Sequence, residues 1–278
     1  MEYQKTFLFI IIILVSQLLF SCFPEKKIAK EFLKKKDYGS ILVLSPKILY
    51  MSNLKIDEID NAENLDQYVL DSLLYFNSKY LQYISDSVFV ENYINNMLEE
   101  FQNLGFETYT EEYFDVFLSL QTPSYILNIS QLELEEYIQE ITDEDYFNGF
   151  SYHINKNVNT VGIYSWLELS EVNSSEDRKE VLFADYEISD ELSGYFRESL
   201  LSSEVKYEYI IDSLSVMDIY EYSSYLGFLY AQYLFDYLMN KEIEKQYNVQ
   251  STPPMYLHFD RIRNKLYTVE KSKFTIIK

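Results

Sequence analysis

Residues 41–44 read Ile-Leu-Val-Leu, a continuous aliphatic run that lies between Gly39 and Pro46. A short β-branched and aliphatic run bounded by turn residues is typical of a central strand that is covered on both faces. Its length alone does not exclude a helix. We take this run as the strand around which the rest of the fold is arranged.

Helical periodicity follows this strand. Apolar residues keep mostly helical spacing over 66–84, and a clearer apolar stripe covers 86–104, with Ser85 or Asp86 as its cap and Gly105 as its C-terminal stop. Extended stretches at 106–109 and 124–141 come next. The order strand, helix, strand predicts an α/β fold with a mixed sheet and flanking helices.

The second half of the chain predicts further strands, a long late helix and a C-terminal β-hairpin. They are strands at 160–172, 180–188 and 205–211, a helix at 215–246 and a hairpin at 256–278 that turns at 263–265. Turns are expected at 143–149 and 173–177, and Pro253-Pro254 breaks the chain. Ser215 and Asp218 have the spacing of a capping box, with aspartate in place of the usual glutamate.

Small residues recur every four positions in the late helix, at Ser223, Gly227 and Ala231. They form one ridge that lets another backbone approach closely. In a membrane such a ridge could associate helices, but charged residues and many tyrosines in this segment favour packing in a protein core.

The first twenty-two residues have the features of a lipoprotein signal. Met1–Thr6 contains one lysine, 7–20 is almost wholly apolar, and Ser21-Cys22 follows. This pattern predicts a signal peptide over 1–21 and lipid attachment at Cys22, the single cysteine of the chain. Phe20 is bulky where a small residue is usual. The alternative is a transmembrane anchor, for which the apolar run falls short of the ~20 residues that a span needs.

Charge is distributed unevenly along the chain. Residues 26–36 hold six lysines against Glu31, so 22–39 is expected to be a basic tether, either a linker or a frayed helix. Its lysines are either simply solvated or bound to anionic headgroups. Residues 37–255 hold ten Lys or Arg against forty Asp or Glu, and this charge excludes nucleic-acid binding. We therefore divide the chain into 1–21, the tether 22–39, an acidic α/β domain 40–248, and a C-terminal hairpin and tail 249–278.

Sequence signatures of enzymes are absent. The chain has six glycines, no phosphate-binding glycine loop, no G-x-S-x-G elbow and no H-E-x-x-H helix. His153 and His258, the only histidines, are interpreted as ordinary strand residues. The acidic segment starting at Asp143 departs from a calcium loop, because glycine is seventh and Ile154 is twelfth. No catalytic residue, cofactor or metal site is predicted.

Two further patterns leave alternatives open. Asp-Ser-apolar triplets at 71–73, 86–88 and 212–214 are similar to an O-glycosylation sequence of Bacteroidota; the alternative is that two of them are helix caps. The twenty-eight tyrosines and Trp166 could form stacking platforms for sugars. Tyrosine also suits half-buried strands, and we favour core or sheet packing for Trp166.

The order of elements and several phrases resemble known envelope proteins. The α/β domain, over roughly 40–240, resembles that of curli-secretion-type and TolB-type lipoproteins. The phrases at 162–166, Gly-Ile-Tyr-Ser-Trp, at 225–227, Tyr-Leu-Gly, and at 234–237, Leu-Phe-Asp-Tyr, are similar to uncharacterised lipoproteins of Bacteroidota. This resemblance implies a role in envelope assembly or secretion through protein contacts. The membrane-inserting hairpins of the curli pore are not recognisable.

The sequence thus predicts a non-enzymatic envelope lipoprotein that is held at the outer membrane through Cys22 and contacts a protein partner. A homo-oligomer stays open. The alternative is a surface lipoprotein that binds or cleaves glycans.

Overall fold

The computed structural model describes residues 24–35, 38–121, 123–147, 149–172, 179–199, 204–246 and 255–277. The predicted signal peptide 1–21, Cys22, the 173–177 loop and Pro253-Pro254 lie outside these residues. The chain forms two compact units: a larger one of Gly39–Ala231 with Lys273–Lys278, and a smaller one of Met1–Tyr38 with Gln232–Ser272. The predicted boundaries at 39/40 and 248/249 stay a prediction.

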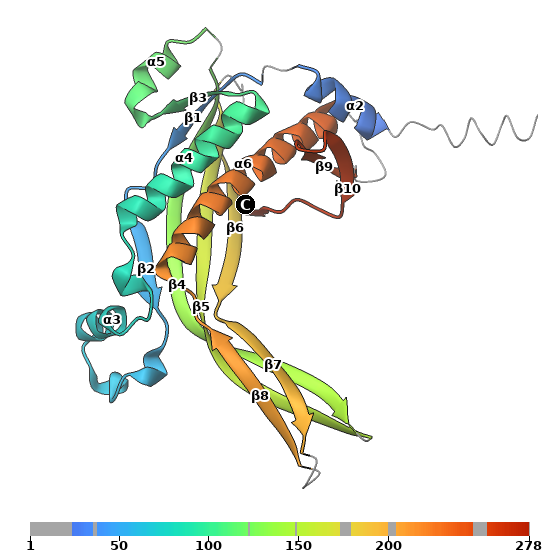
Figure 1. Ribbon diagram of the computed structural model, residues 1–278. Coiled ribbons are helices and arrows are strands. Elements are labelled where there is room, and N and C mark those ends of the chain that lie inside the picture. Colours follow the sequence, from blue (N-terminus) through green and yellow to red (C-terminus); the bar gives the residue numbers. More distant parts are fainter. Residues whose placement is uncertain are drawn as a thin grey trace, which may run out of the picture. The chain divides into compact units, whose positions relative to one another are not determined.

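The larger unit contains a seven-stranded mixed sheet in the order β11-β6-β5-β4-β1-β3, with β2 also paired to β4 (Figure 1). Pairing is parallel for β1 with β3 and β4 and for β2 with β4, and antiparallel along β4, β5, β6 and β11. The strands are β1 (Ser40–Leu44), β2 (Leu49–Asn53), β3 (Glu107–Thr110), β4 (Pro123–Phe147), β5 (Phe150–Glu171), β6 (Lys179–Ser189) and β11 (Thr275–Ile277). The predicted α/β fold class is confirmed.

Strand β1 lies between β3 and β4 in this sheet. Ile41, Leu42 and Val43 are buried, so side chains on both faces of the strand are covered. The prediction of a central strand at 41–44 is therefore confirmed. The chain crosses from β1 to the parallel strand β3 through the helices of the next segment.

Two main helices and several short ones follow β2. They are η1 (Ile56–Glu58), η2 (Ala62–Asn64), α3 (Gln67–Phe76), η3 (Leu81–Tyr83), α4 (Asp86–Leu104), η4 (Glu111–Tyr113) and α5 (Phe114–Leu118). Helix α4 has its predicted bounds, and Gly105 ends it in a left-handed conformation (φ 105°). The helix predicted over 66–84 was too long. It ends at Phe76 because the backbone N–H groups of Lys79, Tyr80 and Leu81 donate to the distant Glu136 carboxylate.

Helix α6 (Val216–Gln246) begins in the larger unit and ends in the smaller one. Its start is the predicted capping box: Ser215 N donates to Asp218 Oδ2 (2.7 Å) and Asp218 N donates to Ser215 Oγ (3.2 Å). A Cβ atom on Gly227 would lie 2.0 Å from the Tyr93 carbonyl oxygen of α4. The small-residue ridge therefore brings two helix backbones together, as predicted for core packing.

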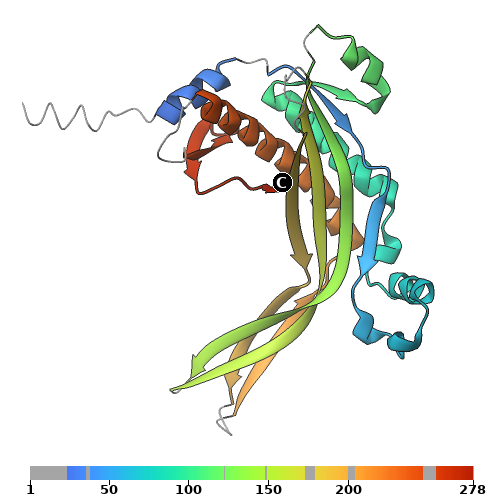
Figure 2. The same ribbon diagram turned by 180° about the vertical axis from the view of Figure 1, so that it is seen from behind.

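The hairpin of β4 and β5 extends beyond the rest of the sheet, and a second hairpin crosses it (Figures 1 and 2). The second hairpin is β7 (Glu191–Glu198) paired antiparallel with β8 (Val205–Asp212). We call residues 137–147, 149–159, 191–199 and 204–212 together the arm. Three predictions were wrong here: Asp143 lies in β4 and not in a turn, β5 begins at Phe150 and not near 160, and β7 was not expected.

The smaller unit contains α2 (Pro24–Leu33), the end of α6, and a hairpin of β9 (Tyr256–Asp260) with β10 (Lys265–Val269). Phe32 packs against Tyr38 and Phe235, with ring centroids 4.9 and 5.6 Å away. The lysine-rich segment is thus a packed helix over 24–33. The predicted C-terminal hairpin is confirmed as β9-β10, but it ends at Val269, and residues 275–277 pair with β6 instead.

No helix in the described part of the chain has the length and apolar character to cross a bilayer.

Candidate functional site

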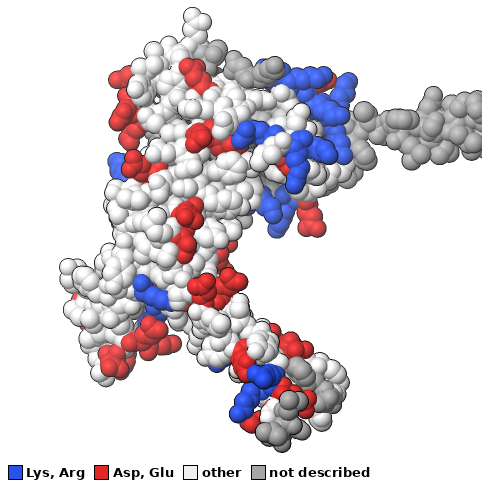
Figure 3. Space-filling model, in the orientation of Figure 1, with Lys and Arg blue, Asp and Glu red and all other residues white. Residues whose placement is uncertain are grey.

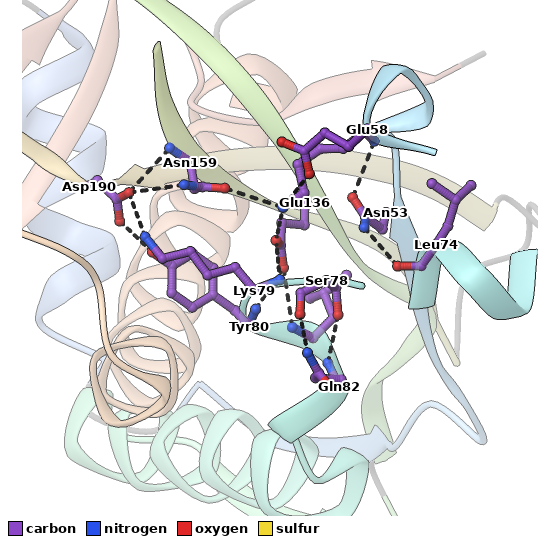
Figure 4. A network of polar contacts seen from close by, with 12 residues as sticks. Asn53, Glu58, Leu74, Ser78, Lys79, Tyr80, Gln82, Glu136, Asn159 and Asp190 are labelled. Carbon is purple, nitrogen blue, oxygen red and sulfur yellow. Dashed lines mark hydrogen bonds and ion pairs between the residues drawn. The ribbon is translucent and has the colours of Figure 1, made fainter. Parts of the chain in front are cut away.

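A buried ionic network lies where the arm leaves the sheet (Figure 4). Glu136 of β4 is completely buried and pairs with Lys55, which is also buried, at 2.7 Å between Nζ and Oε1. The backbone N–H groups of Lys79, Tyr80 and Leu81 donate to its carboxylate at 2.6, 2.9 and 3.2 Å. A buried carboxylate is tolerated when it is paired and hydrogen-bonded in this way.

Asp190 forms the second half of this network, between the end of β6 and the start of β7. It accepts hydrogen bonds from the Tyr80 hydroxyl, from Lys79 Nζ (2.9 Å), from Leu214 N (3.0 Å) and from Asn159 Nδ2 (3.2 Å). Burial alone would raise the pKa of Asp190, but the hydrogen bonds from Tyr80 and Lys79 lower it to about 2.

Asn159 joins the two halves of the network. Its side-chain oxygen accepts from Lys55 Nζ at 3.3 Å, while its amide nitrogen donates to Asp190. The network therefore ties the segment just after β2, the 78–81 turn, β4, β5 and the β6–β7 junction to one another. Because its carboxylates accept hydrogen bonds from donors within the protein, the network holds the base of the arm in place.

The arm consists of two β-ribbons that pack against each other. Phe196 of β7 is buried between Tyr152 of β5 and Tyr207 of β8, with ring centroids 6.3 and 4.8 Å away. The Tyr207 hydroxyl donates to Asp143 at 2.7 Å, and Lys156 Nζ lies 4.1 Å from the centroid of the Tyr209 ring. These contacts give the arm a small core of its own.

Large apolar side chains are exposed on both ribbons of the arm. Ile210 is 74% exposed, Phe150 67%, and Tyr146 and Tyr195 are also mostly exposed. The arm carries nine Asp or Glu against three Lys or Arg. Exposed apolar groups on a structured element, surrounded by mainly acidic side chains, are typical of a surface that binds another protein.

A row of aromatic side chains occupies the face of the sheet opposite α4. The buried side of β5 is fixed by Ser165, which is bonded to Tyr93 of α4, so Tyr164 and Trp166 point to the other side. Phe183 of β6 lies beside them, with ring centroids 4.9 Å from Trp166 and 6.3 Å from Tyr164. Trp166 is therefore half-buried on a sheet face, and Figure 2 shows no helix over the β4–β6 part of this face.

Tyr164 lies flat across Gly162. A Cβ atom at Gly162 would be 2.6 Å from the Tyr164 hydroxyl oxygen, so only glycine leaves room for this ring. Burial, together with nearby Glu135 and Glu187, raises the pKa of the Tyr164 hydroxyl. Burial and then the charge of Glu133 raise the pKa of Glu135. The face thus combines flat rings with carboxylates that are bonded to tyrosine hydroxyls.

The two histidines lie in strands, as expected. His153 is exposed on β5, whereas His258 of β9 contacts the buried Asp236 of α6, at 2.6 Å between Nδ1 and Oδ2. Phe259 N also donates to Asp236, at 2.8 Å. Burial raises the pKa of Asp236, and the contact with His258 partly offsets this rise. Asp236 was not predicted, since its partners are more than twenty residues away.

The remaining candidate residues are dispersed. Cys22 lies outside the described residues. In the three Asp-Ser-apolar triplets, Ser72 donates to Tyr68 O within α3, Ser87 contacts Ser85, and Ser213 accepts from Lys79 Nζ. Asp143 of the acidic segment is bonded to Tyr207. In the described part of the chain, no group of three His, Cys, Asp or Glu residues is placed to hold a metal ion.

The ionic network was not predicted from the sequence, because Glu136 and Asp190 are two among many acidic residues. One signal could have found Glu136: it continues the buried alternation of Leu132 and Leu134 along β4. An acidic residue at an inward position of an apolar strand requires a buried partner. Comparison with known proteins gave no further guide, since no family model, curated protein or solved structure matches this chain.

Proposed function

We propose that this protein is a lipid-anchored, non-enzymatic component of the bacterial envelope, held at the outer membrane through Cys22, that binds a protein partner in envelope assembly or secretion. The observation that supports partner binding is the arm, whose exposed apolar side chains stand on a base fixed by the Glu136–Asp190 network. A fixed base lowers the entropy lost when the arm binds.

The chemistry of the arm favours a protein as the bound molecule. Strands β7 and β8 form a two-stranded sheet, so within the described residues each has an edge without a neighbouring strand. Such edges can accept a strand from another chain, and Ile210 and Tyr195 add apolar contact area beside them. The acidic character of the arm matches a partner surface that is basic around an apolar centre.

The proposal is tested by replacing Tyr146, Phe150 and Ile210 together with serine. These side chains are exposed, so the variant should fold. In intact envelopes, cross-linking followed by quantitative mass spectrometry should recover a discrete partner with the unaltered protein. We expect the triple variant to reduce that recovery at least about tenfold, which corresponds to about 1.4 kcal/mol.

The matched control is Tyr68→Ser together with Phe76→Ser, two exposed aromatic residues on α3. This variant should retain the partner, because it removes similar apolar area elsewhere on the larger unit. Equal recovery with the arm variant and the control would contradict partner binding by the arm.

A second function, binding of a glycan, is favoured by the aromatic row on the open sheet face. A flat tyrosine ring flanked by carboxylates can stack on a sugar ring and accept bonds from its hydroxyl groups. Trp166→Ala with Phe183→Ala should then abolish binding to envelope polysaccharide in a pull-down assay. If polysaccharide binding is measurable and no protein partner is recovered, the glycan function replaces the first proposal.

A further inference from the structure

The two compact units carry opposite net charge. The smaller unit has thirteen Lys or Arg against nine Asp or Glu, whereas the larger unit has ten against thirty-six. Figure 3 shows blue side chains gathered over α2 and the β9-β10 hairpin. A basic region on a strongly acidic protein requires its own explanation, because general solubility would be served by acidic residues throughout.

Helix α2 presents lysines to solvent in a fixed arrangement. Its inner side is held by Ala29 and Phe32, which are buried. Lys27 and Lys30 of α2 are exposed on one outer face, and Lys34, in the turn just after the helix, is exposed as well. A simple solvated tether would not need to fold, and this segment does.

The turn of the β9-β10 hairpin adds an apolar tip with cationic neighbours. Ile262 is 83% exposed and stands between Arg261 and Arg263. The turn is tight: Asn264 has φ 51°, and Arg263 N donates to Asp260 Oδ1 at 2.9 Å. A well-ordered turn that exposes one aliphatic side chain between two arginines has the amphipathic pattern of a segment that enters a membrane interface.

We infer that α2 and the β9-β10 turn form a membrane-binding surface of the smaller unit, with an anionic phospholipid bilayer as its ligand. The exposed lysines would contact headgroup phosphates, and Ile262 would enter the boundary between headgroups and acyl chains. Each cation near an anionic leaflet adds to the attraction, so a few exposed lysines suffice to hold this surface on the bilayer. Cys22 lies two positions before Pro24, and its predicted acyl chains would bring α2 to the same bilayer.

This inference differs from the proposed function in both ligand and surface, because the arm belongs to the larger unit. It also goes beyond lipid attachment, which requires no contact between the folded chain and the headgroups. Of the two interpretations of the α2 lysines, this inference favours binding to anionic headgroups over simple solvation.

The test is hydrogen–deuterium exchange on the full chain reconstituted in lipid nanodiscs. One preparation contains phosphatidylcholine alone, and the other contains about one-third phosphatidylglycerol, which gives the surface a negative potential. In the anionic discs, amide exchange at 24–35 and 260–265 should slow several-fold. High salt should reverse this effect because it screens exposed charges. Peptides of β7 and β8 should exchange equally in both preparations.

A quadruple variant, with Lys27, Lys30 and Lys34 changed to Gln and Ile262 to Ser, should remove the difference between the two lipids. Its exchange in neutral discs reports whether the smaller unit is still folded, and we expect it to match the unaltered protein. Lys206→Gln on β8 is the control and should keep the protection. Equal exchange of 24–35 and 260–265 in neutral and anionic discs would overturn the inference, whether or not the arm binds a partner.

Discussion

The smaller and larger units differ both in charge and in how their polar groups are held. The larger unit is strongly acidic and buries an ion pair, Lys55–Glu136, at the base of the arm. The smaller unit is mildly basic and is organised by aromatic contacts around Phe32 and Phe235, and its buried Asp236 carboxylate contacts His258. The net charge of −22 is therefore a poor description of either unit.

This difference suggests two kinds of contact in one chain. Acidic surroundings suit a basic protein partner at the arm, and the lysines of α2 suit an anionic bilayer. If both units bound one charged partner surface, that surface would attract one unit and repel the other. Substitutions confined to one unit therefore test whether the two units act separately.

The largest effect is expected for Glu136→Ala in the larger unit. The substitution leaves Lys55 buried without its carboxylate and leaves three backbone N–H groups unpaired. The free energy of unfolding should fall by about 3–5 kcal/mol, measured by urea denaturation. Glu140→Ala, at an exposed position of the same strand, should change it by less than about 0.5 kcal/mol. Similar losses for both would mean that the network does not hold the base of the arm.

A smaller and local effect is expected for Asp236→Ala in the smaller unit. The variant loses the contact with His258 and leaves Phe259 N–H without its acceptor, which should cost about 1–3 kcal/mol. Hydrogen exchange should accelerate in β9 and the end of α6. Glu244→Ala, exposed on the same helix, is the control. Faster exchange throughout β4 and β5 would show that the two units do not respond separately.

The smallest effect is a pH dependence that comes from Asp190. Its pKa is about 2 in the folded protein and about 3.9 in an unfolded chain, so its charged form stabilises the fold. This contribution is complete above about pH 5 and is lost as the pH falls through 4 toward 2, with a loss on the order of 1–2 kcal/mol. Asp190→Asn should flatten the stability curve in this window, and Asp212→Asn should not. An Asp190→Asn curve parallel to that of the unaltered protein would contradict this role.

Much of the fold could be predicted where the signal is local. Four apolar residues predicted β1, Gly105 predicted the end of α4, and the Ser215–Asp218 spacing predicted the start of α6. These signals depend on neighbours along the chain. The small-residue ridge around Gly227 could also be predicted from the sequence, because small residues at helical spacing indicate a close contact between helices.

The arm and the ionic network depend on distant residues and could not be predicted. Segment 191–198 has charged ends and contains Gly194, which weakens a strand in isolation. In the folded protein the Tyr207 ring lies across Gly194, where a Cβ atom would be 2.1 Å from its hydroxyl oxygen. Likewise, Glu136 and Asp190 are two of forty-five acidic residues. They differ from the others because they bond to Lys55, Lys79 and Tyr80, which are far away in the sequence.

Photo-cross-linking in intact envelopes tests at once whether the arm contacts a protein and whether the β9-β10 turn contacts lipid. A benzophenone side chain is introduced in place of Ile210 in one preparation and in place of Ile262 in another, two exposed positions in different units. We expect a discrete protein adduct from position 210 and a phospholipid adduct from position 262. The same protein adduct from both positions, or lipid adducts alone from position 210, would contradict this expectation.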